Sequence, residues 1–328
     1  MDNQFHTKDI SHLSFLVTGG AGFIGGHVAE YLLKNGAKTV RVLDNMVNGF
    51  ESNLAVLKQY PCFEFIHGDI RDFETCKKAC VGIDYVSHQA ALGSVPRSIK
   101  EPVYFNDVNV GGFVNMLKAA EENKVKTFVY ASSSSVYGDE TTLPKVESKV
   151  GNCLSPYAVT KKVNELYASV FSENYGMKII GLRYFNVFGP RQDPDGQYAA
   201  VIPLFVKGII KETPVFINGD GEQTRDFTFV ANAVQVNVKA MLTDNASAFN
   251  KVYNVAVGEN YTVNFLYKIC QSTLESKFTA TYRESRQGDI RDSLADISLA
   301  KELLGYIPTT RFEEGLIETV NYFKKIYS

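Results

Sequence analysis

Thr18-Gly19-Gly20-Ala21-Gly22-Phe23-Ile24-Gly25 is the stretch of sequence that decides the fold. It follows a short apolar run and precedes an amphipathic pattern, so its glycines lie at a predicted strand-to-helix turn. Gly19 would permit the tight turn, Gly22 would let a diphosphate approach the backbone, and Gly25 would let the helix pack closely on the sheet. The free amides and dipole of the helix N-terminus would face the phosphates. The spacing therefore predicts a dinucleotide-binding site. The alternative is a glycine-rich turn that binds no ligand.

An acidic residue ends the second predicted strand, Val42-Leu43-Asp44-Asn45. A carboxylate at this place accepts hydrogen bonds from both hydroxyls of an adenosine ribose. It would also repel a 2′-phosphate, so NAD is expected rather than NADP. Asp69 follows the third predicted strand and could accept from the adenine amino group. The plain alternative for Asp44 is a turn residue at a strand end.

The alternation of apolar runs and helical patterns continues outward from the glycine stretch. Strands are expected at Phe15–Thr18, Val40–Leu43, Phe63–Ile66, Tyr85–His88, Thr127–Ala131 and Ile179–Arg183, and helices at Phe23–Lys34, Asn53–Lys58, Asp72–Ala79, Asn106–Glu122 and Tyr157–Tyr175. Such alternation predicts right-handed βαβ units and a Rossmann-type, doubly wound parallel sheet of an α/β protein. The strands are continuously apolar, as expected where both faces are buried.

The regular alternation of predicted strands and helices ends at about Asn186, and a turn-rich stretch follows at Gly189–Gly196. Helices are then expected at Pro203–Lys211, Ala231–Leu242, Val263–Leu274, Ile297–Leu304 and Glu313–Lys325, with a short strand at Val215–Ile217. We expect an NAD-binding domain over residues 1–190. A smaller, mixed α/β substrate-binding region would span 191–328 and be discontinuous, with some strands and helices returning to the first domain. A cleft should lie between them.

Composition excludes several classes of function. The net charge of −2 lacks the basic footprint of a nucleic-acid-binding protein. No apolar run approaches the roughly 18 residues of a membrane span, and the polar start does not resemble a signal peptide. The five cysteines are scattered, without metal-ligand spacing. We therefore expect a cytoplasmic protein with reduced thiols, no metal and no membrane or nucleic-acid partner.

Tyr157-Ala158-Val159-Thr160-Lys161 places a phenol and an ammonium on one face of a predicted helix. The phenol of a free tyrosine has a pKa of about 10. A nearby ammonium and a positive nicotinamide ring would favour the phenolate, so Tyr157 could act as a general base. Lys161 would also hold the nicotinamide ribose. A lone YxxxK is more often an ordinary pair on a helix surface.

Two further polar groups follow strand ends that should face the same cleft. Ser132-Ser133-Ser134-Ser135 ends the fifth predicted strand, and a serine there could share a short hydrogen bond with Tyr157 and a substrate hydroxyl. We take Ser133 and Ser134 as the catalytic candidates, against the plain reading of a serine-rich loop. Asn186 follows the sixth strand and should face the cleft too.

Several longer stretches carry a family resemblance. TGGAGFIG, LDN, GDIRD, HQAA, SSSSVYG, YAVTK and LRYFNVFGPRQ resemble the extended short-chain dehydrogenase/reductases, and the sugar-nucleotide epimerases among them. QAALGSVPRS, SPYAVTK, YAAVIP, INGDGEQTRDF and QGDIRDSLAD are similar to the bacterial UDP-N-acetylglucosamine 4-epimerases that supply O-antigen and other polysaccharide biosynthesis.

The resemblance implies a set of binding residues. NAD would be held by Gly19, Gly22, Phe23, Ile24, Gly25, Asp44, Asn45, Gly49, Asp69, Ile70, Gln89, Ala90, Ala91, Tyr157, Lys161, Tyr184 and Val187. The hexose would meet Ser94, Ser133, Ser134, Tyr157, Asn186 and Ser293, and the UDP would meet Ala200, Val201, Phe205, Phe216, Asn218, Arg225, Arg286 and Asp289. Those relatives carry a Trp near the uridine at the position of Phe205, whereas this chain has no Trp.

The reaction implied is C4 epimerisation of a UDP-hexose, preferably UDP-GlcNAc, UDP-GalNAc or their uronic acids. Tyr157 would take the O4 proton through Ser133 while hydride passes to NAD, and the 4-keto sugar would rotate before hydride returns. Small Ser293 would leave room for an acetamido group. The alternatives are a UDP-sugar dehydratase or decarboxylase, or a non-catalytic NAD-binding protein. A homodimer through the helices at Asn106–Glu122 and Tyr157–Tyr175 is expected by family analogy.

Overall fold

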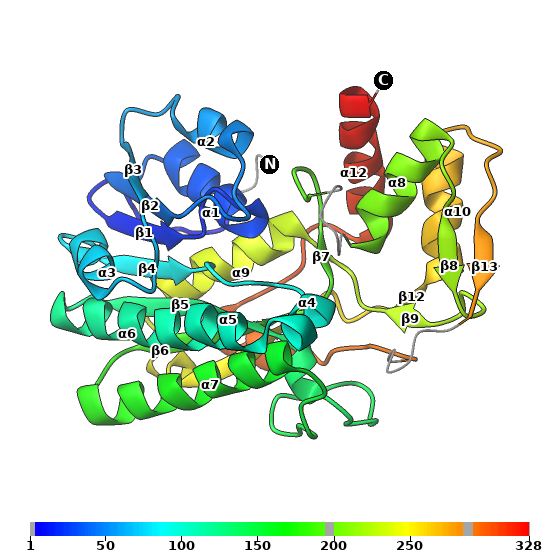
Figure 1. Ribbon diagram of the computed structural model, residues 1–328. Helices are drawn as coiled ribbons and strands as arrows, with labels where there is room; N and C mark the ends of the chain where they lie inside the picture. The colour runs from blue at the N-terminus through cyan, green and yellow to red at the C-terminus, as the bar shows by residue number, and fades with distance from the viewer. Residues whose placement is uncertain (1–3, 194–199, 285–290, 328) are drawn as a thin grey trace.

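A parallel β-sheet forms the centre of the larger lobe (Figure 1). The computed structural model describes residues 4–193, 200–284 and 291–327. Within them, one sheet has seven strands in the order β11-β6-β5-β4-β1-β2-β3. The strands are β1 (Ser14–Thr18), β2 (Thr39–Asp44), β3 (Phe63–His67), β4 (Tyr85–His88), β5 (Thr127–Ser133), β6 (Ile179–Tyr184) and β11 (Lys251–Val255). The order reverses between β1 and β4, which confirms the doubly wound fold and places a topological switch point there.

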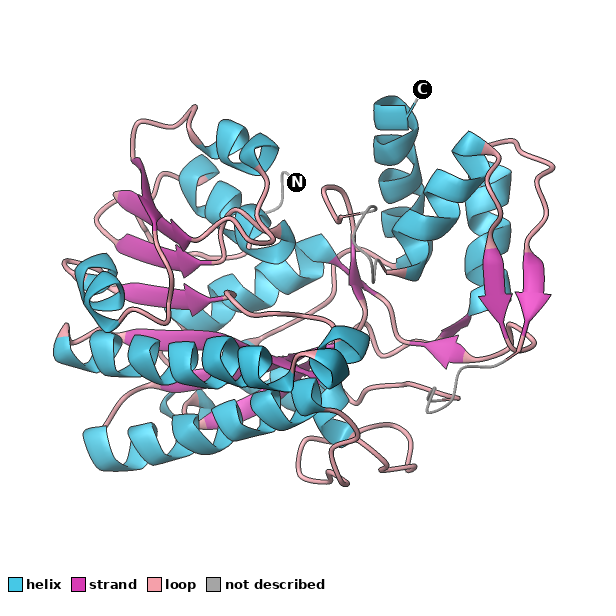
Figure 2. Cartoon of the chain, in the orientation of Figure 1, coloured by secondary structure: helices cyan, strands magenta, loops and turns pink. Residues whose placement is uncertain are grey.

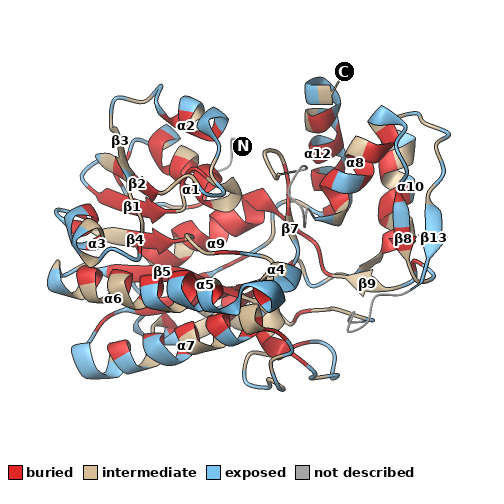
Figure 3. Cartoon of the chain, viewed as in Figure 1, coloured by how far each residue is buried: buried red, intermediate tan, exposed pale blue. Residues whose placement is uncertain are grey.

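Helices cover both faces of this sheet because successive strand side chains point to opposite sides (Figure 2). Phe15 and Val17 of β1 join a core that includes buried residues of α1 (Phe23–Lys34) and α9 (Val230–Leu242), with α2 (Glu51–Leu57) alongside. Leu16 joins the opposite core, which includes residues of α3 (Phe73–Cys80), α6 (Gly112–Glu122) and α7 (Pro156–Tyr175). Figure 3 shows the central strands as mostly buried.

The helix predicted to begin at Asn106 has an irregular start. α4 (Val95–Lys100) and α5 (Pro102–Asn106) precede it, and a π-helical turn at Asp107–Gly111 leads into α6. The buried Asn109 in this turn accepts from Leu92 N at 2.8 Å and donates to Leu92 O at 3.0 Å. The widened turn thus fastens the segment after β4 to the helix layer.

A smaller lobe has its own core. It contains α8 (Val201–Lys211), α10 (Val263–Thr273) and α12 (Phe312–Tyr327), with the strand pair β8 (Phe216–Asn218) and β13 (Thr281–Arg283). The strand pairs β7 (Val187–Phe188) with β10 (Thr228–Phe229), and β9 (Thr224–Arg225) with β12 (Tyr261–Thr262), lie along the path between the lobes (Figure 1). Short helical segments (134–137 and 246–248) and α11 (Ser298–Leu304) complete the elements.

The chain returns to the sheet after its first passage through the smaller lobe. α9 packs on α1, and β11 pairs in parallel with β6. The sequence pattern does not predict β11, because its five residues, KVYNV, include two polar ones. Asn254 is buried here, and it accepts from Tyr137 Oη at 2.6 Å and donates to Lys145 O at 2.8 Å. Its amide is satisfied inside the protein, as a buried polar group requires.

Candidate active site

A cleft of about 890 Å³ opens at the carboxyl ends of the strands. Its lining comes from the turn after β1, the end of β2, the segments after β3 and β4, the end of β5, the start of α7 and the segment after β6. In open α/β sheets, ligands bind at this edge, next to the switch point.

The glycine turn forms a cradle in which Gly19 and Gly25 leave no room for a side chain. Gly19 has φ +68°, and a Cβ there would lie 2.7 Å from Ala90 N. A Cβ on Gly25 would lie 2.3 Å from Gly19 O, so the helix approaches the turn as closely as backbone atoms allow. Gly22 N donates to Gly19 O at 3.1 Å, and Asn53 Nδ2 donates to Ala21 O at 2.9 Å. The fixed cradle and the start of α1 therefore fit a dinucleotide diphosphate.

Asp44 is held firmly at the end of β2. Its Oδ2 accepts from Ala21 N at 3.0 Å and its Oδ1 from Met46 N at 2.8 Å. Burial raises the pKa of the carboxyl, and the two backbone hydrogen bonds oppose this rise. Asp44 lines the cleft, and each oxygen keeps a lone pair for a ribose hydroxyl. The residue type and its orientation suit an adenosine ribose without a 2′-phosphate.

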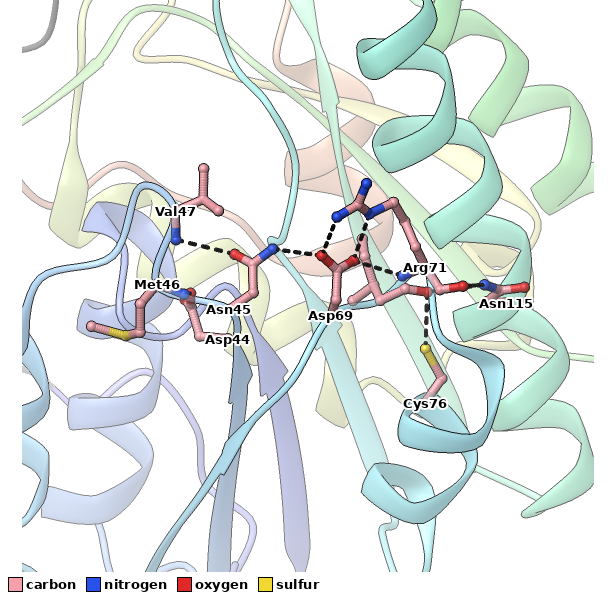
Figure 4. A network of polar contacts seen from close by, with 9 residues as sticks. Asp44, Asn45, Met46, Val47, Asp69, Arg71, Cys76 and Asn115 are labelled. Atoms are coloured by element: carbon pink, nitrogen blue, oxygen red, sulfur yellow. Dashed lines mark hydrogen bonds and ion pairs between the residues drawn. The ribbon is translucent and has the colours of Figure 1, made fainter.

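Asp69 is engaged by protein groups on both oxygens (Figure 4). Oδ1 accepts from Arg71 N at 2.9 Å and Nε at 3.0 Å, and Oδ2 accepts from Arg71 Nη2 at 2.7 Å and Asn45 Nδ2 at 2.9 Å. The Arg71 hydrogen bonds hold the pKa of Asp69 at about 2. Four donors fill the usual capacity of a carboxylate, and among the described residues it is Gly68 and Ile70, not Asp69, that line the cleft. The structure thus uses Asp69 to join the loop after β3 to the end of β2.

Ser133, Tyr157 and Lys161 meet in the cleft. Ser155 caps α7 by accepting from Ala158 N at 3.2 Å, and Pro156 begins the helix, so Tyr157 lies in its first turn. Lys161 Nζ lies 5.9 Å from the Tyr157 ring centroid and donates to Ala131 O at 2.8 Å. The predicted constellation is therefore assembled, except that Ser134 is not among the described lining residues.

The pKa of Tyr157 shifts in the direction opposite to the one expected from the sequence. Withdrawal from water raises the pKa of Tyr157, and a hydrogen bond with Ser133 opposes that rise. The expected lowering by the Lys161 ammonium is not found: desolvation is the largest influence on the pKa of Tyr157, and the Ser133 hydrogen bond is the one that opposes it. Burial also lowers the pKa of Lys161 to about 8. Lys161 is still protonated at neutral pH.

Tyr184 and Gln89 belong to a network that sequence reasoning missed in part. Tyr184 Oη donates to Gln89 Oε1 at 3.0 Å and accepts from Asn237 Nδ2 at 2.7 Å. Asn237 Oδ1 also accepts from Gln89 Nε2 at 3.0 Å. Asn237 is fully buried on α9, and the signal for it was a polar residue inside an apolar helix. Other lining residues that were not predicted are Leu43, Val47, Asn48, Gly68, Leu92, Gly93, Arg97, Glu101, Tyr104, Phe105, Val108, Ala131, Ser132, Gln192 and Asp193.

The predicted substrate residues fall into three groups. Ser94, Asn186 and Ala200 line the cleft with Ser133 and Tyr157. Among the described residues, Val201, Phe205, Phe216, Asn218, Arg225 and Ser293 do not line it. Arg286 and Asp289 lie outside the described residues. Phe205 is buried in the smaller lobe, with its ring centroid 5.3 Å from that of Tyr267, because the apolar face of α8 packs inward.

Asp226 links the smaller lobe to the cleft. Its backbone carbonyl accepts from Asn186 Nδ2 at 2.9 Å. Its carboxylate accepts from the backbone amides of Val257, Gly258 and Ala295 at 3.0, 3.1 and 3.2 Å. Burial raises the pKa of Asp226 to about 7, against those hydrogen bonds. The carboxylate therefore joins its own segment, beside Asn186, to two others, at residues 257–258 and at Ala295.

The described part of the chain offers no group of three or more His, Cys, Asp or Glu residues suited to a metal ion. None of its helices is long and apolar enough to cross a membrane.

Residues 15–256 match the model of the NAD dependent epimerase/dehydratase family. The chain belongs to this family. Membership confirms the sequence-based recognition, and the family and its neighbours solved with NAD confirm NAD as the cofactor. That NAD binds at the glycine turn and Asp44 stays a prediction.

Relatives within the family carry different sugar names. UDP-N-acetylglucosamine 4-epimerase from Methanobrevibacter ruminantium, solved with UDP-N-acetylmuramic acid, is 40% identical, with a TM-score of 0.91 and coverage of 96% of this chain and 99% of that one. UDP-glucose 4-epimerase from Thermotoga maritima, solved with UDP-glucose, is 36% identical, with a TM-score of 0.90 and coverage of 96% and 100%. UDP-glucuronate 4-epimerase of Thermodesulfobacterium geofontis is 35% identical over 95% of this chain and 96% of its own.

Proposed function

We propose that this family member epimerises C4 of UDP-hexoses and prefers UDP-GlcNAc and UDP-GalNAc, or their uronic acids. The observation that carries the proposal is the meeting of Ser133, Tyr157 and Lys161 in one cleft with the glycine turn. The relatives named above as UDP-sugar 4-epimerases support the reaction, and the 40% identical relative supports an N-acetylated sugar.

The side chains divide the proton chemistry between them. NAD, when bound, supplies a reversible acceptor for the C4 hydride. Tyr157 Oη takes the proton of the sugar O4, and Ser133 Oγ, hydrogen-bonded to Tyr157, bridges the two. Because withdrawal from water raises the pKa of Tyr157, base function needs positive charge in the cleft. Lys161, with a pKa of about 8, supplies part of that charge at neutral pH.

Inversion requires that both faces of the 4-keto sugar meet the same groups. The hexose must therefore turn while its UDP stays held. We assign Ser94 and Asn186 to the hexose wall, since both line the cleft. Ala200 also lines the cleft. We propose, from the family resemblance, that the UDP meets Ala200 together with Val201, Phe205, Phe216, Asn218, Arg225, Arg286 and Asp289.

The alternative chemistries find less support in the residues. A dehydratase needs an acid/base pair to eliminate water across C5 and C6, and the run Ser133-Ser134-Ser135 carries no carboxylate. A non-catalytic NAD-binding protein has no need of the assembled tyrosine and lysine, which are both present.

The reaction is tested with purified protein and no added NAD. UDP-Glc, UDP-GlcNAc and their uronic acids are incubated separately, and the C4 epimers are quantified by proton NMR. We expect UDP-GlcNAc and UDP-GalNAc, or their uronic acids, to interconvert faster than UDP-Glc is epimerised. Absence of any epimer, even after NAD is supplied, would refute the proposal, and loss of water or CO₂ would favour the alternatives.

Ser293 is proposed to set the preference for the acetamido group on the strength of the family resemblance, since it does not line the cleft among the described residues. It is half-buried between Asp292, which accepts from Thr224 Oγ1 at 2.7 Å, and Leu294, whose carbonyl accepts from Lys145 N at 2.8 Å. A tyrosine there would fill space that a packed site cannot easily restore. Ser293→Tyr should abolish turnover of UDP-GlcNAc and spare UDP-Glc, and Ser293→Ala should keep both. Wild-type turnover of UDP-GlcNAc by the tyrosine variant would exclude Ser293 as the gate.

A further inference from the structure

A buried ion pair joins two of the elements that build the candidate active site. Glu165 of α7 meets Arg183 of β6, with side chains only 6% and 2% exposed. Arg183 Nε donates to Glu165 Oε1 at 2.8 Å, and Arg183 Nη2 donates to Oε2 at 2.9 Å. The two parallel bonds fix the distance between the groups and also their relative orientation.

Glu165 lies on the same face of α7 as the catalytic candidates. It follows Lys161 by one helical turn and Tyr157 by about two turns. Its Oε1 also accepts from Ser132 Oγ at 2.7 Å. Ser132 immediately precedes Ser133 at the end of β5. The carboxylate thus connects the helix that carries the phenol to the strand end that carries the hydroxyl.

Arg183 anchors the third element. It directly precedes Tyr184, which lines the cleft, and β6 leads on to Asn186, which lines it too. Its Nη1 donates to Glu147 O at 3.0 Å, and its guanidinium lies 4.9 Å from the ring centroid of Tyr137. The donors of Arg183 are therefore engaged on several sides, and the side chain has little freedom to turn.

Stability alone is a poor explanation for this pair. Taking two charges out of water costs several kcal/mol per ion, and well-packed apolar residues of similar volume are often as stable or more so. What apolar residues cannot supply is directional bonding between three elements. We propose that Glu165 and Arg183 are a positioning pair for the reaction, which holds the ends of β5, α7 and β6 so that Ser133 meets Tyr157 while Asn186 faces the same cleft. This inference rests on the proposed epimerase function.

The pair has a specific chemical consequence through Ser133. The Ser133–Tyr157 hydrogen bond opposes the rise that burial imposes on the pKa of Tyr157. If the end of β5 moves away from α7, that opposition weakens. Tyr157 would then lose its proton only at higher pH, and the acidic limb of the kcat profile would move to higher pH. A purely structural defect would lower the amount of folded enzyme without moving this limb.

The main test is Glu165→Gln, which keeps the shape of the side chain. The amide nitrogen cannot accept, so one of the donors on Arg183 or Ser132 loses its acceptor. Since a misplacement of about 1 Å can cost on the order of 100-fold in rate, we expect kcat to fall about 100-fold. KM for the UDP-sugar should change less than about 3-fold, because the hydrogen bonds of the pair go to residues other than those proposed to hold UDP. The kcat profile should shift to higher pH.

Lys162→Met is the matched control. Lys162 also approaches Glu165, with Nζ 3.5 Å from Oε2, but its side chain is 35% exposed and bonds weakly. The Lys162→Met variant should keep the wild-type kcat and pH profile. Ser132→Ala is the second test variant, because it leaves the ion pair intact and removes only the bond toward the end of β5. It should lower kcat about 10-fold, with the same direction of pH shift, as expected for loss of one bond of roughly 1.4 kcal/mol.

The outcomes separate this inference from the proposed function. Wild-type enzyme that epimerises, together with a Ser132→Ala variant of unchanged kcat and pH profile, overturns the positioning role. So does a folded Glu165→Gln variant with wild-type kcat per active site. If Glu165→Gln does not fold, Ser132→Ala decides alone. Wild-type enzyme without epimerase activity refutes the proposed function instead.

Discussion

Gly25→Ala tests whether the close approach of α1 to the glycine turn is needed to hold NAD. The added Cβ would lie 2.3 Å from Gly19 O, 2.8 Å from Gly19 C and 3.1 Å from Gly20 Cα. All three atoms belong to the backbone, so no side-chain rotation relieves the clash. The neighbouring Gly26 offers a scale, because a Cβ there meets Gly20 O at 3.3 Å, a tight contact that a shift of a few tenths of an ångström relieves. The start of α1 must therefore move by about 1 Å, the difference between 3.3 and 2.3 Å.

A shift of this size would take the first amides of α1 away from the diphosphate. Overpacking of a well-packed site costs about 1–3 kcal/mol, so the melting temperature should fall by several degrees. Misplacement by about 1 Å should lower turnover by on the order of 100-fold. The assay denatures the purified variant and measures NAD in the supernatant, beside a thermal melt and epimerase kinetics. We expect little NAD to be retained.

Gly26→Ala is the matched control, since it changes the next residue of the same helix in the same way. It should keep NAD and most of its activity. If the Gly25→Ala and Gly26→Ala variants retain equal NAD and turnover, the close approach of helix and turn is not what holds the cofactor.

Three further predictions concern the base, a buried acid and the assembly. Tyr157→Phe should lower kcat at least about 100-fold, the scale of general-base catalysis, and leave UDP binding intact in calorimetry; wild-type turnover would contradict the mechanism. Asp226 has a folded pKa of about 7, above its unfolded value, so the folded state binds this proton more tightly. Its contribution to stability should therefore decline as pH rises from about 4 to 7, and the urea midpoint of wild type should fall more over that range than that of Asp226→Asn. Leu166 is 57% exposed on α7, and Leu166→Glu should convert the proposed homodimer to a monomer in light scattering; a wild-type monomer would refute that assembly.

Local signals explain what the sequence could predict. The glycine spacing and Asp44 sit at the junction of one strand and one helix, so residues close in sequence carry the whole pattern. The same is true of Tyr157 and Lys161, whose spacing alone places them on one face of α7. The alternation of the first six strands with helices also predicts a parallel sheet of right-handed βαβ units, but it does not fix the order of the strands.

The rest of the candidate site depends on contacts between residues that are distant in sequence, and no local pattern predicts such contacts. Ser132, Glu165 and Arg183 are separate in sequence, and each alone reads as an ordinary polar residue near a strand or helix end. Asn237 bonds to Tyr184 only because α9 folds back over the sheet. The filled hydrogen-bond capacity of Asp69 likewise depends on where Asn45 and Arg71 point, which sequence position does not reveal.

The return of α9 and β11 to the sheet limits how substrate recognition can be transplanted between relatives. A chimera joined at residue 190 would bring a foreign α9 against the native α1 and a foreign β11 against the native β6. Both junctions bury side chains that are packed to their present partners. Grafts confined to the stretch around β8 and β9 and the stretch around β12 and β13 would leave Asn237 and Asn254 in place. The stretches that carry the proposed UDP-binding residues could thus be exchanged in two pieces, whereas the segment between them has to stay with the cofactor-binding sheet.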